Sequence, residues 1–289
     1  MSVKAKKMFG QNFLKDSSVL HRIIQSMPEN STNELIEIGP GLGDLTQWLL
    51  QKRGVVAYEV DRDLCAYLNE RFAKERKAKD FTLHQGDVLA IWDQQGSLSA
   101  TRYDVVANLP YYIATAIILR ALNDTQCQSL RVMVQREVAQ KFAAKPKEKN
   151  FGSLGILAHT LGTVEILFDV PPSAFEPPPK VVSSVLWIQK QREFVGENGV
   201  FENGQMHHAF EQYLKTAFCA PRKRWLKNLS SQYDKTLLAS LLETHSLSLD
   251  VRAHEIDTAT HHHLFKQLTK VNDYVRNEQQ QQQRLQQQP

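Results

Sequence analysis

The 289-residue sequence predicts an α/β protein, with a mixed, mostly parallel sheet followed by a small α-helical domain. Between residues 34 and 135, short apolar runs alternate with amphipathic stretches, which is typical of βαβ units. From Met206 to about Val275 the apolar residues recur at helical spacing instead. We therefore expect one domain over residues 1–191, an α-helical domain over 192–275 and a disordered, glutamine-rich tail over 276–289.

The elements follow one another in a regular order. The first helix is expected from about residue 17 to 27, with Asp16 or Ser17 as its cap. Strands are then expected at 34–39, 55–60, 81–87, 103–109 and 130–135, with helices at 45–52, 64–72 and 114–122. A helix from Glu137, a helix and a strand within 155–170, a proline-rich loop at 171–180 and a last strand at 181–189 complete the first domain, and 192–204 is expected to be a linker.

Composition excludes several classes of protein. The chain is 42% hydrophobic and 23% charged, and no apolar run is long enough to predict a membrane span. The N-terminus lacks the apolar core of a secretory signal, so no such signal is expected in it. The three cysteines, Cys65, Cys127 and Cys219, are scattered, which argues against both a disulfide framework and a zinc site and favours a cytoplasmic location.

A glycine turn follows the first predicted strand of the sheet, in IEIGPGLGDL. Gly39, Gly41 and Gly43 allow the backbone to approach a ligand closely, although a tight structural turn would use glycine too. Asp44 stands where a dinucleotide-binding fingerprint requires its last glycine, so that pattern fails. The E-x-G-x-G-x-G form instead resembles the turn of class I (Rossmann-like) methyltransferases, which binds S-adenosylmethionine.

Acidic residues end the next two predicted strands. Glu59 is placed to accept hydrogen bonds from both hydroxyls of a ribose, and Asp87 from an adenine amino group. A single acid at such a position is more often a helix cap. Three consecutive strand ends with a glycine turn, Glu59 and Asp87 favour a nucleoside site, because ligands of open α/β sheets bind at the carboxyl ends of strands.

The fourth strand ends in NLPYY, residues 108–112. The Asn108 side-chain carbonyl and the Leu109 backbone carbonyl can accept hydrogen bonds from an aromatic amine such as adenine N6. This would favour a more tetrahedral nitrogen whose lone pair points at a methyl sulfonium, with catalysis by positioning and electrostatics. Tyr111 offers a face for a flipped base. The alternative is a turn plugged by an aromatic side chain.

Basic residues concentrate between Glu211 and Asp234, a stretch without acids. We call Arg222, Lys223, Arg224 and Lys227 the basic segment and expect it to bind RNA, although a solvated helix face is the alternative. Further lysine clusters lie at residues 4–7 and 141–149. The HHH run at 261–263 predicts no metal site, because consecutive helical residues point apart.

These motifs together resemble the ribosomal RNA adenine N6-dimethyltransferases of the KsgA/RsmA type. FGQNFL resembles the family's N-terminal cofactor motif, and EIGPGLGDLT, EVDRDL, GDVL and NLPYYIAT follow in the family's order. VMVQREVAQKFAA, FEPPPKVVSSV, AFCAPRKRWLKNL and VRAHEI resemble its later motifs, so the match runs from about Lys6 to Leu268. His254 stands where the family often has an acid, which leaves the role of that segment open.

The resemblance implies a cofactor, a substrate and roles for particular residues. It implies that S-adenosylmethionine is the methyl donor, without a metal, and that two adjacent adenines near the 3′ end of small-subunit (16S) rRNA each receive two methyl groups. An immature small subunit is the implied partner, and a monomer is expected. Its implied contacts are, for the cofactor, Gln11, Asn12, Leu14, Gly39, Gly41, Glu59, Asp87 and Asn108, and, for the target base, Asn108, Leu109, Tyr111 and Phe175.

Three other functions compete with this interpretation. The related antibiotic-resistance methyltransferases act on large-subunit rRNA and share the first motifs, but the basic segment and VRAHEI favour the small-subunit type. Adenine-N6 DNA methyltransferases usually have P-P-Y after their polar residue, whereas Leu109 follows Asn108 here. A non-catalytic RNA-binding assembly factor would not need Glu59, Asp87 and Asn108.

Overall fold

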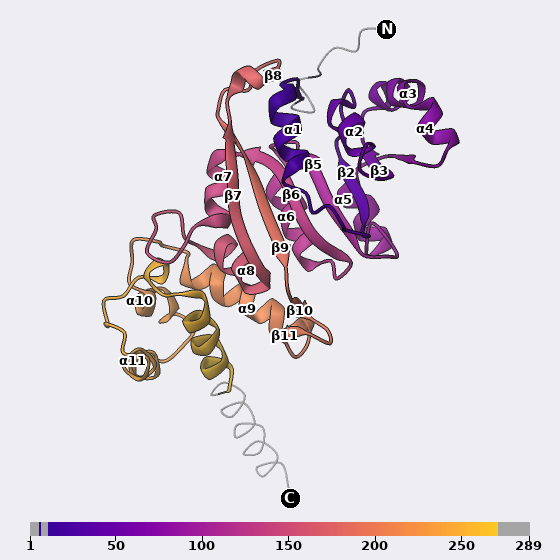
Figure 1. Ribbon diagram of the computed structural model, residues 1–289. Helices are drawn as coiled ribbons and strands as arrows, with labels where there is room; N and C mark the ends of the chain where they lie inside the picture. The colour runs from indigo at the N-terminus through magenta and orange to yellow at the C-terminus, as the bar shows by residue number, and fades with distance from the viewer. Residues whose placement is uncertain (1–5, 7–10, 271–289) are drawn as a thin grey trace, which may run out of the picture. The chain divides into compact units, whose positions relative to one another are not determined.

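The computed structural model describes Lys6 and residues 11–270 (Figure 1). The described residues divide into two compact units: the first contains Lys6, residues 11–143, Leu161–Phe194 and Asn198–Val200, and the second contains Ala144–Thr160, Val195–Glu197 and residues 201–270. The division differs from the expected boundary at residue 192, because 144–160 belongs with the second unit. The tail expected at 276–289 lies outside the described residues.

The first unit contains a seven-stranded sheet with the order β4-β3-β2-β5-β6-β9-β7. Its strands are β2 (Glu34–Ile38), β3 (Val55–Glu59), β4 (Phe81–Gln85), β5 (Tyr103–Asn108), β6 (Cys127–Gln135), β7 (Gly162–Val170) and β9 (Ser183–Lys190). Each neighbouring pair from β4 to β6 is parallel, whereas β9 runs antiparallel to both β6 and β7. This confirms the mixed, mostly parallel sheet of a class I methyltransferase fold.

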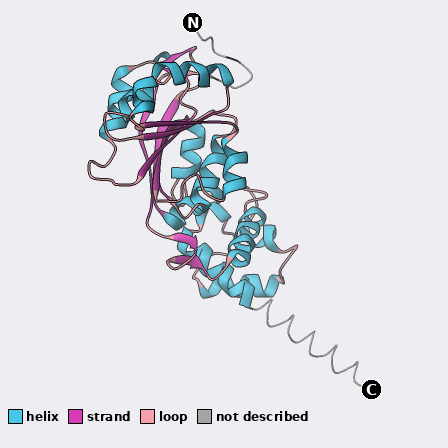
Figure 2. Cartoon of the chain, turned by 90° about the vertical axis from the view of Figure 1, so that its right-hand side faces the viewer, coloured by secondary structure: helices cyan, strands magenta, loops and turns pink. Residues whose placement is uncertain are grey.

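Continuous apolar runs explain why the central strands are buried on both faces. In β5, all residues from Tyr103 to Ala107 are buried, as expected of a parallel strand covered by helices on both sides. The helices of this unit are α1 (Ser17–Gln25), α2 (Asp44–Leu49), α3 (Arg62–Arg71), α4 (Ala73–Lys77), α5 (Val88–Gln95), α6 (Ala114–Asn123) and α7 (Arg136–Ala143). Most strands of the cartoon lie in this unit, as Figure 2 shows.

Aspartates begin three of these helices. Asp16 caps α1 by accepting from the backbone N–H groups of Ser18 and Val19, which confirms the expected start. Asp61 and Asp87 cap α3 and α5 in the same way. Helix α5 was not expected from the sequence, and it is held by its buried Trp92, whose Nε1 donates to Asp124 at 2.7 Å.

Four short strands lie outside the main sheet. β1 (Phe13–Leu14) pairs antiparallel with β8 (Phe175–Glu176), which follows the short 3-10 helix η2 (Pro172–Ala174). This pairing joins the N-terminal motif to the proline-rich loop. β10 (Glu193–Val195) pairs with β11 (Gly199–Phe201), so the linker expected at 192–204 is not irregular throughout but contains two paired strands.

The second unit is helical. It contains most of α8 (Ser153–Leu161), then α9 (Gly204–Ala217), α10 (Trp225–Leu229), α11 (Lys235–Thr244), the 3-10 helix η3 (Ala253–Glu255) and helical residues 258–270. Thr160 Oγ1 lies 2.7 Å from His262 Nε2, which explains in part why residues 144–160 belong here. The ring of His262 also stacks on Phe210, with centroids 4.3 Å apart.

A chain of buried hydrogen bonds passes through the core of the second unit. Trp225 Nε1 donates to the Tyr213 hydroxyl at 3.1 Å, and that hydroxyl lies 2.9 Å from His261 Nδ1. His261 Nε2 lies 2.9 Å from the Ala253 carbonyl, which can only accept, so Nε2 carries the proton. Burial lowers the pKa of His261 to about 4, so the ring is neutral at pH 7. Both of its nitrogens are therefore committed to the core.

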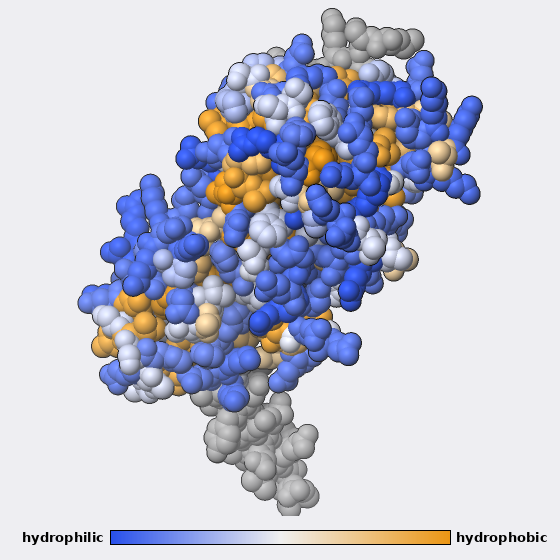
Figure 3. Space-filling model, in the orientation of Figure 1, coloured by the Kyte–Doolittle hydropathy of each residue, from blue (hydrophilic) through white to orange (hydrophobic). Residues whose placement is uncertain are grey.

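The visible surface is mostly hydrophilic, interrupted by apolar areas in both units (Figure 3). Among the described residues, no helix combines the length and the hydropathy that crossing a membrane would require.

Candidate functional site

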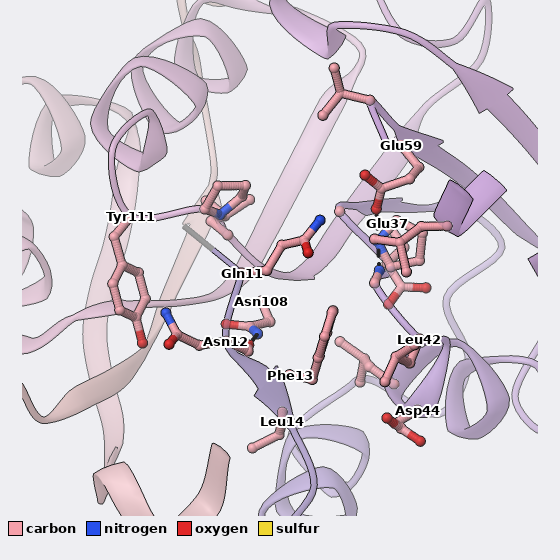
Figure 4. Close-up of a pocket in the computed structure, with 18 of the residues that line it drawn as sticks. Gln11, Asn12, Phe13, Leu14, Glu37, Leu42, Asp44, Glu59, Asn108 and Tyr111 are labelled. Atoms are coloured by element: carbon pink, nitrogen blue, oxygen red, sulfur yellow. Dashed lines mark hydrogen bonds between the residues drawn. The ribbon is translucent and has the colours of Figure 1, made fainter. Parts of the chain in front are cut away.

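A pocket of about 720 Å³ lies in the first unit, at the ends of strands β2, β3 and β5. Nine residues singled out from the sequence line it: Gln11, Asn12, Leu14, Gly39, Gly41, Glu59, Asn108, Leu109 and Tyr111. In the close-up, Glu59 and Tyr111 lie on opposite sides, and the side chains of Gln11, Asn12 and Asn108 lie between them (Figure 4).

The glycine turn forms one wall of the pocket. Gly39 and Gly41 have φ values of +70° and +58°, in the left-handed region that favours glycine. A Cβ on Gly41 would lie 2.9 Å from the Phe13 ring, too close for an ordinary contact. The turn therefore requires glycine for its conformation and for the close approach of the N-terminal segment.

Glu59 lies beside the glycine turn and is held by backbone hydrogen bonds. Its Oε2 accepts from the Gly41 backbone N–H at 3.3 Å, and its Oε1 accepts from the Asp61 N–H at 3.0 Å. The side chain is only 5% exposed. Burial raises the pKa of Glu59, and the backbone hydrogen bonds of Asp61 and Gly41 reduce that rise. Each carboxylate oxygen keeps acceptor capacity for a ligand in the pocket.

The Asn108 amide has a defined orientation. Its Nδ2 donates to the Asn12 backbone carbonyl at 2.9 Å. Because that carbonyl can only accept, the amide cannot be flipped, and Oδ1 remains as the acceptor. No hydrogen bond reaches this oxygen from the described part of the chain. The pocket thus contains one oriented amide carbonyl at the end of β5.

Tyr111 is held by its hydroxyl. This oxygen lies 2.6 Å from Ser183 Oγ, and Ser183 is fully buried in β9. The neighbouring Leu109 is also buried, and its N–H donates to the Met133 carbonyl at 3.1 Å. The NLPY turn is therefore tied to the sheet on both sides of Pro110.

The N-terminal segment is fastened beside the pocket by charged groups. Gln11 Nε2 donates to Asp61 Oδ2 at 3.1 Å, and the Lys6 ammonium lies 2.6 Å from carboxylate oxygens of Asp61 and Asp63. Asp61 is 2% exposed, so the Lys6 contact and the Gln11 hydrogen bond compensate a buried carboxylate. This arrangement places Gln11 and Asn12 in the pocket.

Two of the expected site residues do not line the pocket. Asp87 is exposed, and its Oδ1 accepts from the Leu89 N–H as the cap of α5, so the cap alternative holds for this oxygen. Phe175 is 5% exposed and belongs to the apolar core with Leu14 and Leu20. A stacking role for Phe175 would require the ring to leave this core, and it stays a prediction.

Among the lining residues to which the sequence assigns no role are Glu37, Val60 and Tyr112. Glu37 is 1% exposed, its Oε2 accepts from the Thr46 hydroxyl at 2.6 Å, and burial raises its pKa to about 8. Val60 and Tyr112 are unusual because they are 39% and 62% exposed despite their large apolar surfaces. Glu37 is the acid of the E-x-G-x-G-x-G form and Tyr112 ends NLPYY, whereas Val60 has no sequence signal beyond its adjacency to Glu59.

The basic segment is an exposed feature of the second unit. All four of its side chains are exposed, whereas Trp225 between them is fully buried. Helix α10 starts only at Trp225, so Arg222, Lys223 and Arg224 lie in the preceding turn. Arg224 Nε lies 2.9 Å from Asp250 Oδ1, and both side chains are largely exposed.

Comparison with known proteins identifies the family. The model of the family described as "Ribosomal RNA adenine dimethylase" matches residues 2–270. Proteins named ribosomal RNA small subunit methyltransferase A from Sulfurimonas denitrificans and Campylobacter concisus are 48% and 46% identical over 264 residues, which is 91% of this chain and 94% of each relative.

Solved structures show the same fold at lower identity. A dimethyladenosine transferase from Plasmodium falciparum has a TM-score of 0.74 at 21% identity, covering 89% of this chain and 98% of that one. The 23S rRNA methyltransferase ErmE has a TM-score of 0.69 at 21% identity, covering 89% and 100%. With a family model that matches nearly the whole described chain, the protein belongs to the ribosomal RNA adenine dimethylase family.

Proposed function

We propose that this protein transfers methyl groups from S-adenosylmethionine to N6 of two adjacent adenines near the 3′ end of small-subunit rRNA, as a step in subunit maturation. Family membership and the names of the relatives support this reaction. The observation that carries it is the Asn108 amide, whose carbonyl is oriented by the Asn12 contact beside the glycine turn and Glu59.

The pocket fits the cofactor. Glu59 provides a buried carboxylate for the ribose hydroxyls, and the turn at Gly39 and Gly41, which carries no side chains, would let its backbone approach the methionine part closely. Gln11, Asn12 and Leu14 would cover it from the N-terminal side. When bound, S-adenosylmethionine supplies an electrophilic methyl group on a sulfonium. Asp87 keeps its proposed contact with the cofactor adenine through the carboxylate oxygen that does not cap α5.

The end of β5 performs the central task. The lone pair of adenine N6 is delocalised into the ring, which makes the amine a poor nucleophile. Two carbonyl acceptors, Asn108 Oδ1 and the Leu109 backbone oxygen, would bind both N–H groups and favour a tetrahedral nitrogen with its lone pair directed at the methyl group. Tyr111, fixed by Ser183, would provide the stacking surface for the extruded base, with Phe175 as the proposed second ring.

The basic segment would bind rRNA phosphates. Its exposed charges suit contacts to the backbone, which position an RNA without reading its sequence. An immature small subunit is the proposed partner, and a monomer acting in the cytoplasm remains the expectation.

The choice between subunits rests on the relatives. Both a dimethyladenosine transferase and ErmE, which is named a 23S rRNA methyltransferase, match the fold with similar TM-scores, so the fold alone does not distinguish the rival substrates. The relatives at 46–48% identity are named for the small subunit, and they favour that substrate.

Incubation of the purified protein with S-adenosylmethionine and unmethylated ribosomal particles, followed by mass-spectrometric mapping of the rRNA, tests the proposal. We expect N6,N6-dimethyladenosine at two adjacent positions near the 3′ end of the small-subunit rRNA, and far less of it with the Asn108→Ala variant in the same time. Dimethyladenosine in large-subunit rRNA would support the rival substrate. Binding of the particles without any methylation would support the assembly-factor alternative.

A further inference from the structure

A second cluster of basic residues lies in the second unit, in the loop after α7. We call Lys145, Lys147 and Lys149 the basic loop. All three side chains are exposed. The loop is ordered by its own contacts, since Glu148 Oε2 accepts from the Lys145 N–H at 3.0 Å and the buried Phe151 donates its N–H to the Glu148 carbonyl at 3.0 Å.

One segment, residues 250–255, holds both the basic loop and the basic segment, and we call it the brace. The Lys147 N–H donates to the His254 carbonyl at 2.8 Å, and the Trp225 N–H donates to the Val251 carbonyl at 2.8 Å. Arg224 and Arg252 form an antiparallel bridge. The loop and the segment, about 75 residues apart in the sequence, are thus attached to neighbouring positions of one short stretch.

The brace also explains why His254 can replace the acid that the family often has there. The contact to the basic loop uses the backbone carbonyl of His254, which any residue supplies. The brace itself is fixed by Glu255, whose Oε2 accepts from the Arg252 N–H at 2.7 Å, and by the buried Ala253 and Ile256.

Charge is concentrated on these three elements. The basic segment, the basic loop and Arg252 carry eight positive side chains, opposed by Glu148, Asp250 and Glu255. The basic segment, the basic loop and the brace together therefore carry a net positive charge that exceeds the +4 of the entire chain. Such a concentration of exposed Lys and Arg is the electrostatic pattern of a nucleic-acid-binding surface.

The backbone of Lys147 makes this position suitable for a test. Its φ is +75°, in the left-handed region where a lysine costs conformational energy and a glycine does not. A glycine here would therefore remove one positive charge without a cost in folding.

We propose that the basic loop is a second RNA-binding element, which the brace joins to the basic segment to form one phosphate-binding surface on the second unit. The ligand class is the rRNA sugar–phosphate backbone, so the inference rests on the proposed function. Lys141 is left out, because it lies on α7 in the first unit.

Binding of an unmethylated transcript of the 3′ part of small-subunit rRNA, measured from 50 to 300 mM KCl, tests the proposal. The plot of log K against log[salt] has a negative slope. For Lys145→Gln/Lys147→Gln/Lys149→Gln we expect this slope to become about two to three units less steep. The matched variant is Lys74→Gln/Lys77→Gln/Lys79→Gln, which removes three exposed lysines of the first unit and should leave the slope nearly unchanged.

Lys147→Gly separates binding from folding. It should make the slope about one unit less steep while the melting temperature stays equal to or above that of the wild type. Lys79, with a φ of +65° on an exposed turn, offers the control: Lys79→Gly should relieve the backbone equally without affecting RNA binding.

The outcomes distinguish this inference from the proposed function. If the wild type does not bind the transcript or methylate the particles, the proposed function fails. If the wild type binds, and loss of the basic segment weakens binding while the loop variants bind normally, only this inference is overturned. Loop variants that bind the transcript normally but bind whole particles less tightly would instead assign the loop to a ribosomal protein.

Discussion

The pocket of the first unit and the basic surface of the second rely on different physics. In the pocket, Glu59 is 5% exposed and accepts two backbone hydrogen bonds, and Asn108 is oriented by a 2.9 Å contact to Asn12. On the surface, Arg224 is 62% exposed and shares an exposed ion pair with Asp250. Activity at the pocket depends on the orientation of single groups, so the loss of one atom should have a large effect. RNA binding at the surface depends on the sum of many exposed charges, so the loss of one side chain should have a small effect.

The largest expected effect comes from Asn108→Ala. It removes an oriented acceptor that is used in the transition state, so we expect kcat for methyl transfer to fall by about 10²–10³-fold, roughly 3–4 kcal/mol. Single-turnover transfer of labelled methyl groups to small-subunit particles measures this.

Cofactor affinity provides the control for Asn108. Because Asn108 also contacts Asn12, the variant should be titrated with S-adenosylhomocysteine by calorimetry. We expect an affinity within a few-fold of the wild type. Normal turnover of the variant would rule out the proposed role of the amide.

The second largest effect is expected on the pH dependence of stability, and it comes from the buried acid Glu37. Its pKa is raised by burial to about 8, so the folded protein keeps a proton that the unfolded chain releases above about pH 4.5. The unfolding free energy therefore falls as pH rises towards 8, by about 3 kcal/mol between pH 5 and pH 7. Glu37→Gln, which mimics the protonated side chain, should remove this part of the pH dependence.

Denaturant unfolding of wild type and Glu37→Gln at pH 5, 6 and 7 measures this difference. The two stability curves should diverge with rising pH, and the variant should be the more stable at pH 7. Parallel curves would mean that Glu37 is ionised in the folded protein, and that its pocket is better solvated than its 1% exposure indicates.

The third prediction tests whether the four charges of the basic segment together bind RNA. Neutralising Arg222, Lys223, Arg224 and Lys227 together should weaken binding of the small-subunit transcript by about tenfold at moderate salt and flatten its salt dependence. The cofactor affinity should not change. If the RNA affinity and the salt slope do not change, the basic segment is a solvated helix face and does not bind RNA.

The sequence predicts the pocket well because its residues occupy strand ends whose places are set by topology. Once β2, β3 and β5 are recognised as parallel, Gly39, Glu59 and Asn108 must meet at one edge. Asp87 satisfied the same rule, yet its side chain caps α5, because an aspartate before a helix has a closer partner in the helix N–H groups.

Other features depend on contacts between segments that are distant in the sequence. Phe175 is drawn into the core by the pairing of β8 with β1, and no local pattern indicates that pairing. The raised pKa of Glu37 follows from burial that its strand alone does not reveal. The basic loop was read only as a charge cluster, because its attachment to the brace is made by backbone groups, which carry no sequence signal.

The smallest expected effect tests how Arg224 contributes to the surface. Asp250→Asn breaks its exposed ion pair, so the unfolding free energy should change by less than about 1 kcal/mol. RNA affinity should nevertheless rise about two- to five-fold, because Arg224 becomes available and a repulsive charge is lost near the phosphates. Glu243→Gln removes one exposed acid from α11 and serves as the control for net charge. An equal gain in both variants would mean that only total charge matters, whereas a gain confined to Asp250→Asn would place a phosphate contact at Arg224.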